Sequence, residues 1–228
     1  MISKNVKKEM KEPYFTTKTI ENAAEKMVHH LNTMDRLTFY PEKSALIVLD
    51  MQDYFLNPSS HAFIPSASAI IKGILNLAHI GMDKNRPVIL TRHLNTENNA
   101  GMLSTWWRDV IRETNDNSEI IPELKAIQAP ILKKSQYDAF YQTDLEENLL
   151  SKNVTQVIVT GVMTHLCCET TARSAFVRGF QVFFPVDGTA TYNSEHHEAT
   201  LLNLSHGFAQ ICLISDLISK MEEIHAKA

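Results

Sequence analysis

Short apolar runs alternate with longer amphipathic segments along this chain. The runs, rich in β-branched residues, predict six strands, at residues 45–49, 87–91, 129–132, 156–160, 181–185 and 209–214. Apolar positions at helical spacing predict the main helices, at residues 67–84, 143–151, 164–178, 194–205 and 216–225. Strands that alternate with helices are typical of βαβ units. We therefore expect an α/β fold with a six-stranded, mostly parallel sheet and helices on both faces.

The chain before the first strand has a different pattern. Residues 1–16 are polar and charged, and we expect them to be frayed. Residues 17–31 carry apolar positions at helical spacing, which predicts one amphipathic helix. The sequence therefore predicts an N-terminal extension over 1–43 and one domain over 44–228, a length that suits a single α/β domain.

Composition excludes several classes of partner. A formal net charge of -4 and a pI of about 6.2 give no footprint for nucleic acid or a membrane surface, and no apolar run has the length of a membrane helix. Three cysteines, two of them adjacent, are no disulfide framework, so we expect a cytoplasmic protein. Glycine-rich phosphate loops and the common zinc spacings are absent, so we expect neither a cofactor nor a metal. The expected partner is a small-molecule substrate.

Reactive side chains follow three of the predicted strands. Asp50 closes the first strand, Lys134 follows the third, and Cys167 follows the fourth at the start of a helix. The carboxyl ends of parallel strands meet at one edge of a sheet, so we expect these side chains to lie together. Each residue alone would also fit a purely structural role, as a turn aspartate, a solvated lysine or a small buried cysteine.

Together the three residues suit nucleophilic catalysis. A helix N-terminus lowers the pKa of a thiol, so we expect Cys167 to favour the thiolate. Asp50 would act as base and later as acid, and Lys134 would hold both charges. Backbone N–H groups of Met163 and Cys167 would form the oxyanion hole.

Three segments resemble the signatures of a known family. Residues 45–55 (ALIVLDMQDYF), 134–145 (KSQYDAFYQTDL) and 161–167 (GVMTHLC) are similar to those of the isochorismatase-like hydrolases, also called cysteine hydrolases. The resemblance implies a Rossmann-like three-layer α/β/α domain over 44–228, often dimeric or tetrameric. It also implies an Asp50–Lys134–Cys167 triad and a cis peptide between Val162 and Met163.

The resemblance leaves two chemistries open. Cys167 favours the branch that cleaves C–N bonds of small amides, imides or carbamoyl compounds through a cysteine-linked acyl intermediate. His165, Cys168 and the pair Trp106-Trp107 resemble the branch that hydrolyses vinyl ethers. In that alternative Asp50 is a general acid and no covalent step occurs.

Nicotinamidases of this family add a metal site with an Asp-x-His shortly after the second strand. This chain reads Thr91-Arg92-His93 there. The resemblance therefore implies neither the metal nor a nicotinamidase.

Specificity is expected to lie in the irregular stretch 92–121 and beside the nucleophile. Arg92 is a candidate for binding a substrate carboxylate, although a loop ion pair suits it equally. Trp106 and Trp107 are candidates for the wall of a pocket, with only one of them expected to face it. Thr164 and His165 complete the predicted substrate-binding set. Tyr137 is expected to pack its loop rather than touch substrate, and His61 lies in a loop that could cover the site.

Overall fold

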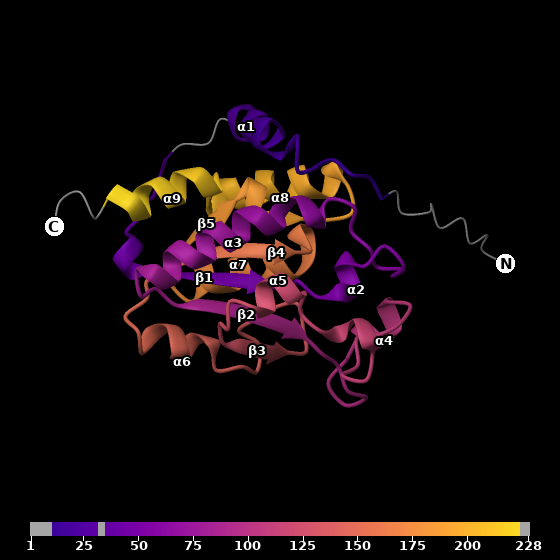
Figure 1. The fold of residues 1–228 in the computed structure, drawn as a ribbon. Coiled ribbons are helices and arrows are strands. Elements are labelled where there is room, and N and C mark those ends of the chain that lie inside the picture. The colour runs from indigo at the N-terminus through magenta and orange to yellow at the C-terminus, as the bar shows by residue number, and fades with distance from the viewer. Residues whose placement is uncertain (1–10, 32–34, 224–228) are drawn as a thin grey trace.

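The sheet is the centre of the molecule (Figure 1). The computed structural model describes residues 11–31 and 35–223. Six strands form the main sheet, as expected, and every described strand pair is parallel; their order, which the sequence did not predict, is β3-β2-β1-β4-β5-β7. These strands are β1 (Ser44–Leu49), β2 (Val88–His93), β3 (Ile131–Lys134), β4 (Gln156–Val162), β5 (Gln181–Pro185) and β7 (Gln210–Cys212). A seventh strand, β6 (Thr189–Ala190), was not predicted because it has only two residues; it pairs with β4.

The strand order reverses beside β1. Strands β2 and β3 lie on one side of it, and β4, β5 and β7 lie on the other. Because parallel crossovers are right-handed, α3 (Ala67–Asp83) and α7 (Glu169–Val177) cover opposite faces of the sheet. The result is the expected three-layer α/β/α arrangement. Every residue of β1 and β4 is buried, which explains their unbroken apolar runs.

Four of the remaining helices follow the predictions with shifted ends: α1 (Ile20–Leu31), α6 (Leu145–Leu150), α8 (Ser194–Gly207) and α9 (Ile214–Glu223). Three helices of four residues each were not predicted: α2 (Asp53–Leu56), α4 (Leu103–Trp106) and α5 (Pro122–Lys125). The predicted end of the last helix, residue 225, lies outside the described residues. The helix expected at 164–178 is split: a π-helix, Thr164–Cys168, precedes α7. No helix in the described ranges has the length and apolarity to cross a membrane.

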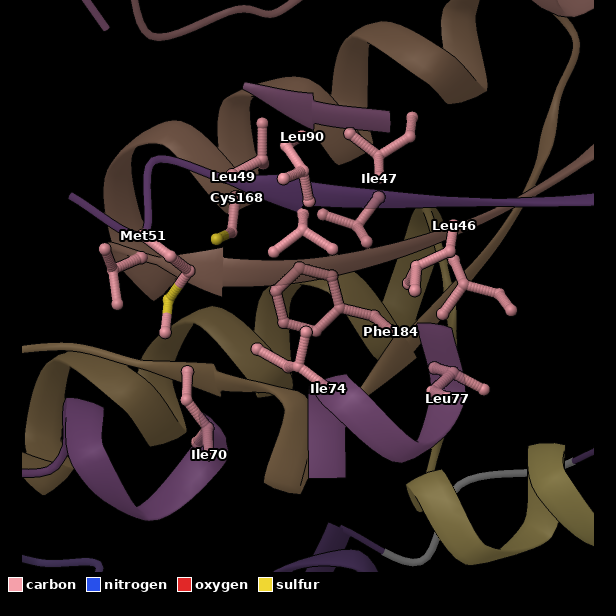
Figure 2. Packing of buried hydrophobic residues seen from close by; sticks show 14 of the residues in the cluster. Leu46, Ile47, Leu49, Met51, Ile70, Ile74, Leu77, Leu90, Cys168 and Phe184 are labelled. Carbon is pink, nitrogen blue, oxygen red and sulfur yellow. The ribbon is translucent and has the colours of Figure 1, made fainter. Parts of the chain in front are cut away.

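The core between the sheet and α3 is apolar throughout (Figure 2). Leu46 and Leu49 of β1, Phe184 of β5, and Ile74 and Leu77 of α3 all belong to one buried apolar cluster. Burying one such side chain stabilises a fold by about 1.5–3 kcal/mol. The core therefore fixes the position of the strands whose ends carry the polar residues.

Gly161 marks the closest approach of β4 to β1. Its φ is +105°, and a Cβ there would lie 2.1 Å from the Leu49 carbonyl oxygen. Only glycine fits both the conformation and the space. This approach brings the residues after β4 next to the end of β1.

The described part of the N-terminal segment is bound to the domain, which corrects the expectation of fraying for residues 11–16. The side chain of Phe15 is buried, and its N–H donates to Ser66 Oγ at 3.0 Å. Glu12 Oε1 accepts hydrogen bonds from the Ser194 N–H at 2.8 Å and hydroxyl at 2.7 Å. Residues 1–10 of the expected extension lie outside the described residues, and its boundary at residue 43 stays a prediction.

Candidate active site

Three strand ends bring Asp50, Lys134 and Cys167 together. Asp50 follows β1 and Cys167 follows β4, the neighbouring strands at which the strand order reverses. In open α/β sheets this reversal opens a crevice at the carboxyl ends of the strands. Lys134 ends β3, two strands away from β1, and its long side chain crosses the end of β2 to reach the other two residues.

Asp50 is fully buried and held as a carboxylate. Its backbone is left-handed, with φ +52°, which turns the side chain back toward β2. The Thr91 hydroxyl donates to Asp50 Oδ1 at 2.5 Å, and Lys134 Nζ lies 2.8 Å from Oδ2. Burial acts to raise the pKa of Asp50, but the Lys134 charge and hydrogen bonds from Cys167 and Lys134 hold that pKa below its usual value. Asp50 is therefore an acceptor for a proton.

The Lys134 ammonium lies at the centre of the site. Besides Asp50, it donates to the carbonyl of Gln136 at 2.8 Å and to Cys167 Sγ at 3.4 Å. Burial acts to lower the pKa of Lys134, yet the Asp50 charge and the hydrogen bonds to Asp50 and Cys167 raise it above its usual value. The buried lysine therefore stays charged and balances the Asp50 carboxylate.

Cys167 lies within the π-helix rather than at a free helix start, and only 5% of its surface is exposed. Burial raises the pKa of the Cys167 thiol well above its usual value, and the Lys134 charge offsets this only in part because Asp50 acts in the opposite direction. The expectation of a lowered pKa was therefore wrong for the free protein. Its thiol is neutral and interacts with the Asp50 carboxylate.

The neighbouring thiol faces the other way. Cys168 is fully buried, and Figure 2 shows it among the apolar side chains beside Leu49 and Met51. Its Sγ lies 3.8 Å from the Thr160 carbonyl oxygen. Cys168 therefore belongs to the core, while Cys167 reaches the pocket.

The peptide bond between Val162 and Met163 is cis, as the family resemblance implied. The Met163 carbonyl accepts hydrogen bonds from the N–H groups of Leu166 and Cys168, at 3.1 and 3.2 Å. The turn is thereby closed around Cys167, and Met163 lines the same pocket as the thiol.

A cavity of about 190 Å³ opens above Cys167. Most of its wall is aromatic or aliphatic, including Tyr54, Phe55, Leu103, Trp107, Ile111, Tyr137, Met163, Leu166 and Tyr192. Flat apolar walls with few polar groups suit a small planar ligand.

Only one of the two tryptophans faces this cavity. Trp107 lines it and donates from its indole N–H to the Tyr137 hydroxyl at 2.6 Å. Trp106 is 75% exposed and lies outside the lining. The candidate role of Trp106 was therefore wrong, and Tyr137 lines the pocket rather than only packing its loop.

Three other predicted substrate-binding residues also lie outside the lining. Arg92 is buried in an ion pair with Glu119, at 2.7 Å, so the loop ion pair is the interpretation that the structure favours. His165 Nδ1 lies 2.6 Å from Thr191 Oγ1, and Thr164 bonds to the ring of His197 on α8. Through these contacts, Thr164 and His165 hold the turn that carries Cys167.

His61, which the sequence analysis placed in a loop that could cover the site, lines the pocket together with Tyr54, Asp109 and Lys11, which it did not single out. Tyr54 donates its hydroxyl to Asp109, and His61 Nε2 lies 3.1 Å from the same carboxylate. Lys11 donates to the His61 carbonyl at 2.6 Å and also lines the pocket. The sequence indicated the loop of His61 but not its contacts with Lys11 and Asp109, because about 50 residues separate each of these parts of the chain.

Three side chains at this site, Asp50, His93 and Cys167, have atoms that could bind a metal ion. Ligand atoms of Asp50, His93 and Cys167 lie within 4.8 Å of one another, the one such group among the described residues. Lys134 Nζ lies 2.8 Å from Asp50, 3.2 Å from His93 Nδ1 and 3.4 Å from Cys167. The ammonium occupies the space that these three atoms share, so their arrangement does not fit a metal ion.

The chain is similar to known proteins in sequence and in fold. The family model of the isochorismatase domain matches residues 44–216. The chain is 44% identical to nicotinamidase 3 of Arabidopsis thaliana over 173 residues, which cover 74% of this chain and 83% of that protein. It is 26% identical to enterobactin synthase component B of Escherichia coli over 183 residues, which cover 79% of this chain and 64% of that protein. A cysteine hydrolase of Pseudomonas syringae has the same fold, with a TM-score of 0.78 at 24% identity over 82% of this chain and 96% of that one.

Proposed function

The chain belongs to the isochorismatase family of hydrolases, and we propose that it cleaves the C–N bond of a small, planar carboxamide through an acyl intermediate on Cys167. The observation that carries the proposal is the position of Lys134 Nζ, 2.8 Å from Asp50 and 3.4 Å from Cys167, below an aromatic pocket. This places a base, a cation and a thiol around one point.

The first half of the reaction uses each of these groups. Asp50, held as a carboxylate, takes the Cys167 proton as Sγ attacks the carbonyl carbon. The oxyanion accepts hydrogen bonds from the backbone N–H groups of Met163 and Cys167. Asp50 then returns its proton to the nitrogen, the C–N bond breaks, and the amine or ammonia leaves a thioester on Cys167.

The second half restores the thiol. Asp50 takes a proton from a water molecule, whose oxygen attacks the thioester carbonyl. The C–S bond breaks, the acid product leaves, and Cys167 recovers a proton from Asp50. Lys134 stays protonated throughout and balances the charge that moves between Asp50 and Cys167.

The aromatic lining supports a ring-bearing carboxamide as substrate. The missing Asp-x-His led us to expect no nicotinamidase, but the 44% identity to nicotinamidase 3 makes nicotinamide the first compound to test. The vinyl-ether alternative needs Asp50 as an acid. The lowered pKa of Asp50 keeps its carboxylate ionised in the free protein, which supports its use as the base in the first step of amide cleavage.

The test compares wild type with Cys167→Ala and the matched neighbour Cys168→Ala on nicotinamide, other aromatic carboxamides, ureido acids and isochorismate. We expect carboxamide hydrolysis by wild type and Cys168→Ala, and a loss of about 10³-fold or more in kcat for Cys167→Ala. Mass spectrometry of a quenched reaction should find the acyl group on Cys167. Near-full activity of Cys167→Ala on isochorismate, with no carboxamide turnover by wild type, would establish the vinyl-ether chemistry instead.

A further inference from the structure

We propose that His93 is a positioning residue, which Asn95 holds in one tautomer so that its ring accepts a hydrogen bond from Lys134 and keeps the ammonium between Asp50 and Cys167. The inference rests on the proposed amide hydrolysis and adds two residues, His93 and Asn95, to its machinery. Four features of the structure support the inference. They are the position of β2 between β3 and β1, the hydrogen bond of the His93 ring to Asn95, the hydrogen bonds of the His93 backbone to Gln52, and the position of Lys134 Nζ.

The strand order puts His93 beneath the Lys134 side chain. Strand β2 lies between β3 and β1, and His93 and Lys134 are direct partners at the ends of β2 and β3. Lys134 must therefore cross the end of β2 to reach Asp50. Because successive side chains of a strand point to opposite faces, His93 faces the site while Arg92 faces its ion pair with Glu119.

The contacts of the ring select one tautomer. His93 Nε2 lies 3.0 Å from Asn95 Oδ1, and Asn95 Nδ2 donates to the Ser135 carbonyl at 2.8 Å. The amide oxygen can only accept, so Nε2 carries the hydrogen. Nδ1 then presents its lone pair to Lys134 Nζ at 3.2 Å. Burial and the Lys134 charge lower the pKa of His93 to about 4, so the ring remains an acceptor at neutral pH.

The backbone of His93 is clamped from the segment that carries Asp50. Gln52 Oε1 accepts from the His93 N–H at 2.8 Å, and Gln52 Nε2 donates to the His93 carbonyl at 3.1 Å. Gln52 is fully buried and also donates to the Ser118 carbonyl at 2.7 Å. The acceptor for Lys134 and the carboxylate that pairs with it are therefore fixed relative to each other, as pre-organised catalysis requires.

The same geometry distinguishes this role from a metal ligand. A metal bound by Asp50, His93 and Cys167 would have to lie where Lys134 Nζ contacts all three. Two cations cannot share that space. In this proposal, the His93 ring is an acceptor for the Lys134 ammonium rather than a metal ligand.

The test uses His93→Ala, which removes the acceptor, and His93→Gln, which retains a side-chain carbonyl. With the best carboxamide, we expect kcat to fall about 10- to 100-fold in His93→Ala with KM within about twofold, the loss usual when a partner that orients a catalytic group is removed. His93→Gln should recover part of the loss, and it also serves as the test variant if His93→Ala does not fold. An unchanged kcat, or a rise in KM alone, would overturn the proposal.

Asn95→Asp tests the tautomer. A carboxylate at this position favours the protonated ring, whose Nδ1–H would then face the Lys134 ammonium. We therefore expect kcat of Asn95→Asp to fall as the pH is lowered from 8 to 6, with an acidic limb that wild type lacks. The same profile as wild type would contradict the role given to Asn95.

Two further measurements separate the possible failures. Alkylation of Cys167 by iodoacetamide at pH 8 needs no substrate, and it should be slower in His93→Ala because a displaced Lys134 stabilises the thiolate less. If wild type hydrolyses no carboxamide, the proposed function fails while this rate still tests His93; an unchanged rate would refute the positioning role. One bound metal per wild-type chain, lost together with activity in His93→Ala and on chelation, would also overturn the proposal.

Discussion

Replacing Lys134 by methionine should reverse the way in which this site makes stability depend on pH. Lys134→Met keeps most of the side-chain length and removes the charge. Both side chains of the pair are fully buried and 2.8 Å apart. Removing one partner of such a pair costs about 3–5 kcal/mol, because the other charge is left buried without compensation. Thr91 still donates to Asp50 at 2.5 Å, so we expect the lower end of this range, about 3 kcal/mol at pH 7.

The direction of the pH dependence follows from the pKa of Asp50. In wild type this pKa is lowered, so the pair contributes stability that is full above the unfolded value of about 4 and is lost as the pH falls through the folded pKa. In Lys134→Met, burial without the ammonium raises the pKa of Asp50 instead. The folded variant then binds a proton that the unfolded chain releases above pH of about 4. Its stability should therefore increase as the pH falls from 7 toward 5.

Urea unfolding followed by circular dichroism, between pH 5 and 8, measures both effects. The control is the double variant Asp50→Asn with Lys134→Met, which carries no buried charge in the pair. It should recover much of the lost free energy of unfolding and show no pH dependence from this site. A loss below about 1 kcal/mol for Lys134→Met at pH 7, with the pH slope of wild type, would refute the assignment of a buried ion pair.

Three further substitutions have expected outcomes, and the first two have matched controls. Gly161→Ala places a Cβ 2.1 Å from a backbone oxygen of β1 and should prevent folding, whereas Gly179→Ala, with a similar φ of +88° and open space, should lower the free energy of unfolding by only about 1–2 kcal/mol. Trp107→Ala should raise KM about 2- to 12-fold, since one such aromatic contact contributes about 0.5–1.5 kcal/mol, and Trp106→Ala should leave KM unchanged. Arg92→Ala should reduce thermal stability without changing KM, because its guanidinium is buried in ion pairs away from the pocket. A change in KM would instead support the earlier prediction that Arg92 binds substrate.

The sequence by itself determined the sheet and the meeting of three side chains. Apolar runs with strand spacing predicted six parallel strands, and parallel strands end at a common edge. Asp50 directly follows β1, Lys134 is the last residue of β3, and Cys167 lies in the turn after β4, so their proximity needed no knowledge of the long loops. Local chain position therefore carried the arrangement of the candidate triad.

Only the tertiary structure decided which side chains face the pocket and how burial changes their pKa values. Trp106 and Trp107 are neighbours in sequence, as are Arg92 and His93, yet only one of each pair faces the pocket, because adjacent side chains on a helix or strand point to different sides. Burial of Cys167 raised the pKa that its position near a helix start had suggested would be low. The exposure of a side chain and its orientation toward the pocket depend on contacts between segments far apart in the chain. The local sequence pattern therefore does not predict them.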